Sequence, residues 1–240
     1  LGNKTIFKIL KKKNTNKLFY FKKIIDLLCR MQLIKNRNIT NFKNKIYYIP
    51  KYNEKVLINE ANLFSKWYAE QNLKGSKKKT FSKEFDEVIR KLISKLHFKN
   101  DVFVHRDFHV SNLMLVRDKI GVIDSQDALI GNKAYDLASL VDDVRFKTSK
   151  SFKKKVYDYY LKKQKNLIKS KFKNDFEILS VLRNLKIIGI FTRLSLRDGK
   201  KKYIKLIPYT WELINMRIKE NEVFLDLKNL LSQNFKKKIK

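Results

Sequence analysis

A short polar segment, VHRDFHVSN at residues 104–112, follows directly on an apolar run in the middle of the chain. It places Asp107 five residues before Asn112, and a second carboxylate, Asp124, follows after another apolar run. A carboxylate can accept the proton of an attacking hydroxyl, and carboxylate and amide oxygens are the hard ligands that Mg²⁺ prefers. These are the groups that phosphoryl transfer requires.

The spacing inside the segment predicts a reaction class. His105-Arg106-Asp107, four further residues and Asn112 reproduce the H-R-D-x-x-x-x-N catalytic loop of kinases, in which the Asp is the base and the Asn a metal ligand. Asp124 stands where kinases place a second metal-binding Asp, after a strand, a turn and a strand. We therefore predict a phosphotransferase centre built on these residues.

Short β-prone runs must position these side chains. They are Val102-Phe103-Val104, residues 113–116 and residues 120–123, and the last two are separated by the turn-like segment 117–119. We expect a hairpin over 113–123. Because antiparallel pairing joins the start of one strand to the end of the other, Asn112 and Asp124 should lie at the same end of it.

Elsewhere the sequence predicts helices. Apolar residues recur at helical spacing over 18–31, 56–68 and 81–96, with Thr80 or Ser82 as the cap of the third helix. Further helices are expected at 134–145, 151–169, 174–196, 203–219 and 221–234. Residues 45–49 form a weak strand candidate. We predict an α+β, mainly helical fold with a small catalytic hairpin.

Composition limits the other readings. The 240 residues are 43% hydrophobic, with no apolar run near the roughly 18 residues of a membrane span and no signal-peptide pattern at the start. Cys29 is the one cysteine, which a reducing compartment tolerates. We expect a soluble, cytoplasmic protein without a membrane partner.

The net charge of +33 allows two interpretations. Lysine supplies 46 of the 56 basic residues, whereas nucleic-acid readers rely on arginine. We therefore favour codon bias toward A/T and solvated helix faces over a polyanion site as the origin of the charge. The aromatics Trp67, Tyr68, Phe81 and Phe85 fall on apolar stripes, which leaves few platforms for stacking bases. We expect no specific nucleic-acid partner.

The segment VHRDFHVSNLMLVRDKIGVIDSQDALIGNKAYDLASLVDDVR, residues 104–145, resembles the catalytic segment of the aminoglycoside phosphotransferase superfamily, whose members have a protein-kinase-like fold. Residues 121–137 are most similar to the bacterial kinases of cell-wall amino sugars. That resemblance extends to residues 52–68 and 189–199. It implies ATP- and Mg²⁺-dependent phosphorylation of the anomeric hydroxyl of N-acetylmuramate or N-acetylglucosamine during peptidoglycan recycling.

The resemblance also implies roles for single residues. Asp107 corresponds to the catalytic base, Asn112 and Asp124 to the Mg²⁺ ligands, and His105 and Arg106 to the scaffold of the loop. Alternative readings are that Asp124 merely ends a strand and that His109 is only a loop donor.

Two departures from the family pattern concern positioning. Ser125 replaces a usual Phe, and Val110-Ser111 replaces the commoner Pro-Gly.

Asp136 corresponds to the family's structural acid, although it could equally cap the helix at 134–145.

The acceptor site is less defined. Arg193 and Arg197, four residues apart, and Asp127 are candidates for binding the substrate, with pairing to Asp or Glu of neighbouring helices as the alternative for the arginines. A kinase acting on an aminoglycoside or an amino alcohol, and a non-catalytic basic binding module or degenerate fragment, remain open. The sequence does not reveal the oligomeric state.

The parts that grip the nucleotide in an N-terminal lobe have no match here. Six scattered glycines form no phosphate loop, and no strand lysine is apparent. We therefore expect residues 1–240 to form the C-terminal lobe of the kinase, with its N-lobe missing, and the chain alone to be weakly active or inactive.

Overall fold

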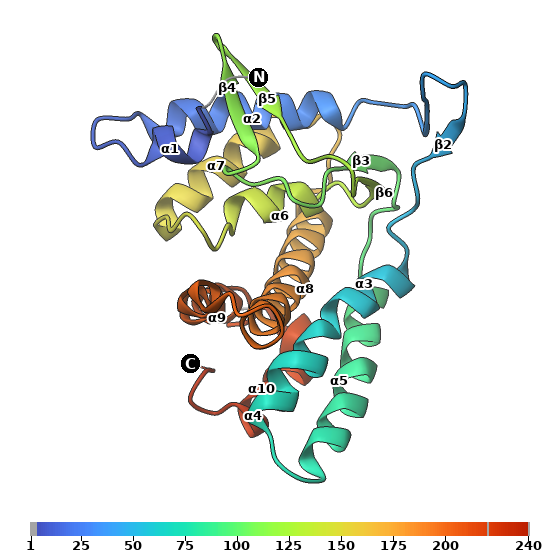
Figure 1. Cartoon of the computed structure of the whole chain (residues 1–240), viewed down its shortest axis with the longest axis vertical. Helices are drawn as coiled ribbons and strands as arrows, with labels where there is room; N and C mark the ends of the chain where they lie inside the picture. The colour runs from blue at the N-terminus through green and yellow to red at the C-terminus, as the bar shows by residue number, and fades with distance from the viewer. Residues whose placement is uncertain (1–3, 220, 240) are drawn as a thin grey trace. The chain divides into compact units, whose positions relative to one another are not determined.

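The computed structural model describes residues 4–219 and 221–239 and divides the chain into two compact units. The first contains the residues up to 52 and residues 98–176, and the second contains residues 53–97 and 177–240. Helices dominate, as predicted (Figure 1). In the part of the chain that is described, no helix is long and apolar enough to cross a bilayer.

The first unit combines helices with three two-stranded sheets. Its elements are α1 (Ile6–Leu10), α2 (Lys17–Met31), β1 (Asn38–Thr40), β2 (Ile46–Tyr48), β3 (Val102–Val104), β4 (Leu113–Val116), β5 (Lys119–Val122), β6 (Leu129–Gly131), α6 (Tyr135–Val141), α7 (Lys150–Lys163) and the start of α8 (Lys169–Leu196). Each sheet is antiparallel: β1 pairs with β2, β3 with β6, and β4 with β5.

The predicted hairpin is confirmed in this unit. Leu113 pairs with Val122 and Val116 with Lys119, so residues 117 and 118 form a two-residue turn. Strand β6 was not predicted. It pairs with β3, and its Gly131 permits close packing, because a Cβ there would lie 3.0 Å from a methyl of Val104 and 3.2 Å from the Cβ of Tyr52.

In its described residues, the regular secondary structure of the second unit is entirely helical. It contains α3 (Glu54–Ala61), the π-helix η1 (Phe64–Ala69), α4 (Glu70–Asn72), α5 (Lys77–Ser94), the rest of α8, the 3₁₀ turn η2 (Lys201–Leu206), α9 (Ile207–Ile218), the 3₁₀ turn η3 (Glu222–Phe224) and α10 (Leu225–Asn234). Aromatic rings form its core: Phe64 packs against Phe85, Trp211 and Phe235 with centroid separations of 5.4, 5.7 and 5.6 Å.

Some helix boundaries differ from the sequence prediction, whereas the end of α8 at Leu196 agrees with it. Helix α5 begins at Lys77, so the predicted cap at Thr80 or Ser82 is wrong. Helix α6 ends at Val141 rather than near residue 145, because the Asp143 carboxylate accepts the backbone N–H of Arg145 and turns the chain. Arg197 lies just beyond the last residue of α8.

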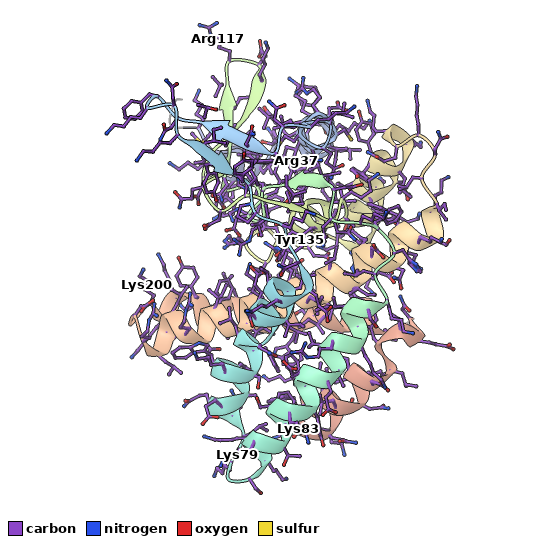
Figure 2. All side chains as sticks on the ribbon, turned by 90° about the vertical axis from the view of Figure 1, so that its right-hand side faces the viewer. Arg37, Lys79, Lys83, Arg117, Tyr135 and Lys200 are labelled. Atoms are coloured by element: carbon purple, nitrogen blue, oxygen red, sulfur yellow. The ribbon has the colours of Figure 1, made fainter. Side chains whose placement is uncertain are left out.

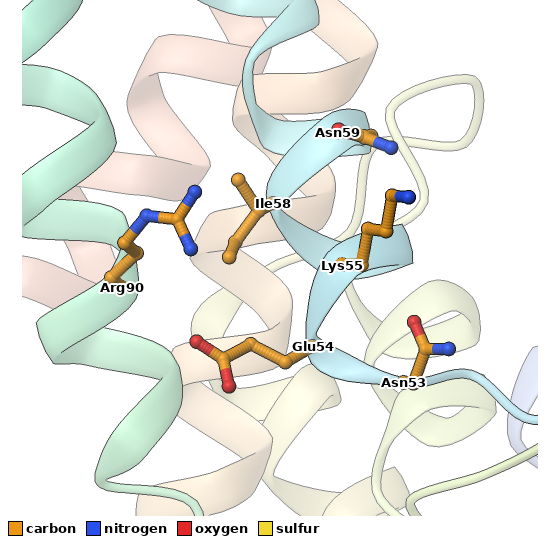
Figure 3. Close-up of a pocket in the computed structure, with 6 residues that line it drawn as sticks. All are labelled: Asn53, Glu54, Lys55, Ile58, Asn59 and Arg90. Carbon is orange, nitrogen blue, oxygen red and sulfur yellow. The ribbon is translucent and has the colours of Figure 1, made fainter.

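Figure 3 shows a pocket of this unit with a volume of about 520 Å³. It is lined by residues in and just before α3 and by Arg90 of α5. Glu54 and Arg90 face each other across it (Figure 3). Arg90 is already held by Asp86, with 2.6 Å between Nε and the carboxylate. The cavity holds none of the residues that the sequence assigned to chemistry.

Gly189 of α8 provides a test of the packing in the second unit. A Cβ at this position would lie 2.3 Å from the carbonyl carbon and oxygen of Leu63 and 2.6 Å from the backbone nitrogen of Phe64. Glycine to alanine within a helix normally stabilises by about 1 kcal/mol. Here Gly189→Ala should lower the free energy of unfolding by about 3 kcal/mol, since backbone atoms cannot move aside.

Urea unfolding would measure this effect. Gly121→Ala is the control, because its added methyl would meet a side chain, that of Val116, at 3.3 Å. Equal stability of the two variants would contradict the close approach of α8 to residues 63 and 64.

Candidate active site

The polar segment predicted to carry chemistry forms the loop between β3 and β4 in the first unit. The chain leaves β3 at Val104, buries His105 and turns sharply at Arg106, which has a φ of 71°. A left-handed conformation costs a non-glycine residue about 1–2 kcal/mol. Other contacts must therefore hold this turn.

Asp136, in the first turn of α6, supplies these contacts. Its carboxylate is buried and accepts the backbone N–H of His105 at 2.7 Å and that of Arg106 at 3.0 Å. Hydrogen bonds to a charged acceptor contribute about 1.5–3 kcal/mol each, which exceeds the cost of the turn. The carboxylate of Asp136 thus fixes the backbone immediately before Asp107.

The Arg106 side chain holds the turn from the other side. Its guanidinium donates to the carbonyl of Asp127 at 3.1 Å and lies 5.7 Å from the centre of the Tyr52 ring. Tyr52 is joined in turn to β6, because its N–H donates to the carbonyl of Ile130 at 2.8 Å. Sequence reasoning missed this role of Tyr52, although the residue opens one of the segments that carried the family resemblance.

The loop closes on itself around Asp107. The carbonyl of Asp107 accepts the N–H of His109 at 3.0 Å and the Nδ2–H of Asn112 at 3.1 Å. His109 is buried and its carbonyl accepts the N–H of Asn112 at 2.9 Å. These bonds fix the backbone of Asp107, and its half-buried side chain still reaches the surface.

Asp124 is joined to the same loop through the residue before it. The N–H of Ile123 donates to the carbonyl of Asn112 at 3.0 Å, and the carbonyl of Ile123 accepts the Nε2–H of His105 at 3.0 Å. Asp124 follows with a φ of 65° and an exposed side chain. The structure thus brings Asp107, Asn112 and Asp124 to one end of the β4–β5 hairpin, as the sequence predicted.

The oxygen atoms of Asn112 and Asp124 fit a hard divalent cation. Within the described residues, neither Asn112 Oδ1 nor the Asp124 carboxylate takes part in a hydrogen bond or ion pair. Over the same residues, no three His, Cys, Asp or Glu side chains cluster as a metal site. Mg²⁺ is commonly bound by one or two protein ligands together with water and substrate phosphates, so a two-ligand site of this kind suits it.

The other predicted site residues are less closely engaged. Asp127 is exposed in the turn between Asp124 and β6, and its backbone rather than its carboxylate contacts Arg106. In the second unit, Arg197 pairs with the adjacent Asp198 at 2.7 Å, whereas Arg193 has a buried Nε without a hydrogen-bond partner in the described chain. The partner of Arg197 is the next residue in the chain, not an acid of a neighbouring helix, which was the alternative for this arginine.

Sequence comparison identifies a family for this chain. Residues 20–167 match the model of a phosphotransferase enzyme family, more than half of the chain. The chain belongs to this phosphotransferase family. The match includes the whole loop from His105 to Asp136, which confirms the family resemblance seen in the sequence.

Two named bacterial relatives illustrate the similarity. An N-acetylmuramate/N-acetylglucosamine kinase of Neisseria meningitidis serogroup B is 36% identical over 168 residues, which are 67% of this phosphotransferase chain and 50% of the relative. The enzyme of the same name from Pseudomonas aeruginosa is 28% identical over 242 residues, which are 97% of the chain and 67% of the relative. The chain thus spans about half to two thirds of these two relatives.

Solved structures show the same fold at low sequence identity. An AMP-bound spectinomycin phosphotransferase has a TM-score of 0.56 at 13% identity, with 92% of this chain and 71% of that chain covered. A Plasmodium vivax ethanolamine kinase has a TM-score of 0.57 at 14% identity, with 90% and 62% covered. The predicted kinase-like, mainly helical fold is confirmed, while the assignment of residues 1–240 to a C-terminal lobe stays a prediction.

The buried imidazole of His105 should make the free energy of unfolding depend on pH. Burial lowers the pKa of its imidazole below 6.5, against the opposing effects of the hydrogen bond to Ile123 and of the Asp107 and Asp124 carboxylates. Between this lowered pKa and 6.5 the unfolded chain binds more protons than the folded chain, so the free energy of unfolding falls as pH falls. His105→Gln should lose less stability than wild type when the pH is lowered from 7.5 to 5.5.

Chemical denaturation at several pH values would measure both curves. At pH 7.5, where the imidazole is neutral in both states, the difference between the proteins reports only the lost contacts of His105. Parallel curves down to pH 5.5 would contradict a neutral, buried His105.

Proposed function

We propose that this chain carries the catalytic centre of an ATP- and Mg²⁺-dependent kinase that phosphorylates an amino sugar. The acceptor we favour is the anomeric hydroxyl of N-acetylmuramate or N-acetylglucosamine, as in the recycling of cell-wall sugars. The observation that supports this most is the hydrogen-bonded loop that gathers Asp107, Asn112 and Asp124 at one end of a hairpin.

Asp107 is the proposed proton acceptor. A catalytic base must stand in a fixed position beside the attacking hydroxyl, and the two hydrogen bonds to its own carbonyl hold its backbone in place. It is half-buried, so an acceptor sugar can approach while bulk water is partly excluded. The Asp136 carboxylate keeps the loop in this conformation, because it accepts the backbone N–H groups of His105 and Arg106.

Asn112 and Asp124 are the proposed Mg²⁺ ligands. A bound Mg²⁺ would neutralise the phosphate oxygens of ATP as charge develops on them during transfer. The contribution of the chain is to present one amide oxygen and one carboxylate from positions tied together through the peptide of Ile123. Hydrogen bonding of Asn112 Nδ2 to Asp107 directs the opposite atom, Oδ1, away from the loop backbone.

The identity of the acceptor is supported by the names of the sequence relatives, which are amino-sugar kinases. Arg193 and Asp127 stay candidates for binding it, and Arg197 is a weaker one because Asp198 already neutralises its charge. An aminoglycoside is a polycation that requires carboxylates around it, and a chain with a net charge of +33 favours it less than an acidic sugar.

The first test replaces the proton acceptor. Asp107→Asn is nearly isosteric but cannot take a proton, so in the full-length gene product ADP release dependent on N-acetylmuramate should fall about 10²–10⁴-fold. Asp118→Asn, at the exposed turn of the same hairpin, is the matched control and should keep wild-type turnover.

Circular dichroism would show whether both variants remain folded. A folded Asp107→Asn variant with wild-type turnover would exclude Asp107 as the base. Wild-type protein that phosphorylates neither amino sugar, but does phosphorylate ethanolamine or spectinomycin, would reassign the acceptor and leave the catalytic centre intact.

The second test separates the two metal ligands. Asp124→Ala should weaken Mg²⁺-dependent binding of a non-hydrolysable ATP analogue more than Asn112→Ala does, because a carboxylate supplies charge as well as an oxygen. Calorimetric titrations with and without Mg²⁺ would measure the difference. Equal Mg²⁺·nucleotide affinity for wild type and Asp124→Ala would count against the ligand assignment.

A further inference from the structure

The segment from 33 to 48 differs from every other stretch of similar length in the described chain, because each of its residues is exposed. It includes the β1–β2 hairpin, which stands away from the other elements of the first unit (Figure 1). Phe42 at its tip is 91% exposed, and Tyr48 and Tyr47 are 67% and 54% exposed. We call residues 33–48 the exposed hairpin.

Apolar side chains occupy both faces of the exposed hairpin. Tyr48 and Ile46 share one face of the hairpin with their cross-strand partners Asn38 and Thr40. The pair Ile39 and Tyr47 projects from the other face. Neither face is covered by the rest of the unit. Sequence reasoning expected few exposed aromatics, and that expectation is wrong for this hairpin, although Tyr68, Phe81 and Phe85 are buried as expected.

The exposed hairpin is nevertheless well organised. The Asn41 side chain accepts the N–H groups of Lys43 and Lys45 at 2.9 and 3.0 Å, which fixes the tip. At the base, the guanidinium of Arg37 (Figure 2) donates to the carbonyls of Ile34 and Asp101. An isolated two-stranded hairpin is marginal in water, so these contacts stabilise the backbone of the hairpin before any partner binds.

Charge on this segment has one sign. No Asp or Glu occurs between Asp26 and Glu54, while Lys35, Lys43 and Lys45 are exposed on the hairpin. A pocket of about 360 Å³ shares Leu33 with the hairpin and is lined further by Lys133 and Lys165. The surface therefore combines aromatic rings with positive charge, which complements an anionic partner.

Three kinds of partner could cover this surface: a second copy of the hairpin, a lipid membrane or single-stranded nucleic acid. A second copy of the hairpin would bring lysines against lysines, which opposes self-association. Insertion into lipid would bury the amides of Asn38, Asn41 and Asn44 beside the apolar rings, and burying an unpaired amide is costly. Single-stranded nucleic acid avoids both problems, since its phosphates meet the lysines and its bases stack on the rings.

We propose that the exposed hairpin binds single-stranded nucleic acid without sequence preference. Stacking uses the ring of Phe42, Tyr47 or Tyr48, and every base offers a π-face, so the surface tolerates any sequence. Duplexes of the same length bind less tightly, because their bases are already stacked on each other.

Fluorescence anisotropy with a labelled thymidine oligonucleotide of about 20 nucleotides tests this proposal. The variant Phe42→Ala/Tyr47→Ala/Tyr48→Ala should bind it at least tenfold more weakly than wild type. Affinity itself falls between about 50 and 200 mM salt through counterion release, but the ratio of wild type to the aromatic variant should stay constant, since stacking is not screened.

Charge variants locate the phosphate contacts. Lys43→Glu/Lys45→Glu should weaken binding strongly, whereas the matched control Lys79→Glu/Lys83→Glu, with the same change of charge on exposed positions of α5 (Figure 2), should weaken it little. Inorganic polyphosphate, which has no bases, should bind wild type and the aromatic variant equally. Because all these positions are exposed, circular dichroism should show unchanged folding.

Several outcomes would overturn the proposal. Equal losses in the two charge variants would mean diffuse attraction over the whole basic surface, and an unchanged aromatic variant would exclude stacking. Cosedimentation with phosphatidylserine vesicles that requires Phe42, without oligonucleotide binding, would assign the hairpin to membranes. Sedimentation equilibrium showing a dimer that the aromatic substitutions dissociate would assign it to a second copy.

Discussion

The two hydrogen bonds from the backbone of His105 and Arg106 to the carboxylate of Asp136 are the constraint on which the proposed catalytic loop depends. The chain must reverse at the end of β3 without a glycine, and it does so with Arg106 in a left-handed conformation. Two charge-assisted bonds outweigh that strain and satisfy two N–H groups that the turn leaves outside any sheet. The direction of Asp107 follows from this turn.

A second constraint extends from the turn to the proposed metal ligands, Asn112 and Asp124. The peptide groups of Ile123 bond to His105 on one side and to Asn112 on the other, and Asn112 bonds back to the carbonyl of Asp107. This chain of bonds requires a proton on Nε2 of His105, and burial lowers the pKa of its imidazole, which favours the neutral form. A three-residue strand and a hairpin of two four-residue strands are small elements, so side-chain bonds hold together what sheet pairing alone could not.

The sequence predicted those parts of the centre that depend on local pattern. Two β-prone runs on either side of a short turn predict the hairpin, and its register brings Asn112 and Asp124 together. Pairing of β6 with β3 was not predictable, since residues 129–131 are few and contain a glycine, and only tertiary packing against Tyr52 makes them a strand. Exposure of Tyr47 and Tyr48 was equally hidden, because an apolar run indicates a strand but not what covers it.

Two electrostatic effects of different range act on any anion near this loop. The net charge of +33 attracts anions from a distance and raises association rates, an effect that salt screens within about 10 Å. At short range Asp107, Asp124 and Asp127 repel phosphate oxygens, and lysines elsewhere on the surface cannot cancel carboxylates in contact with a ligand. Under the proposed function, salt should therefore act mainly on the rate of encounter. The dependence on a divalent cation that we propose would arise locally, because these carboxylates need a positive charge between themselves and the phosphates.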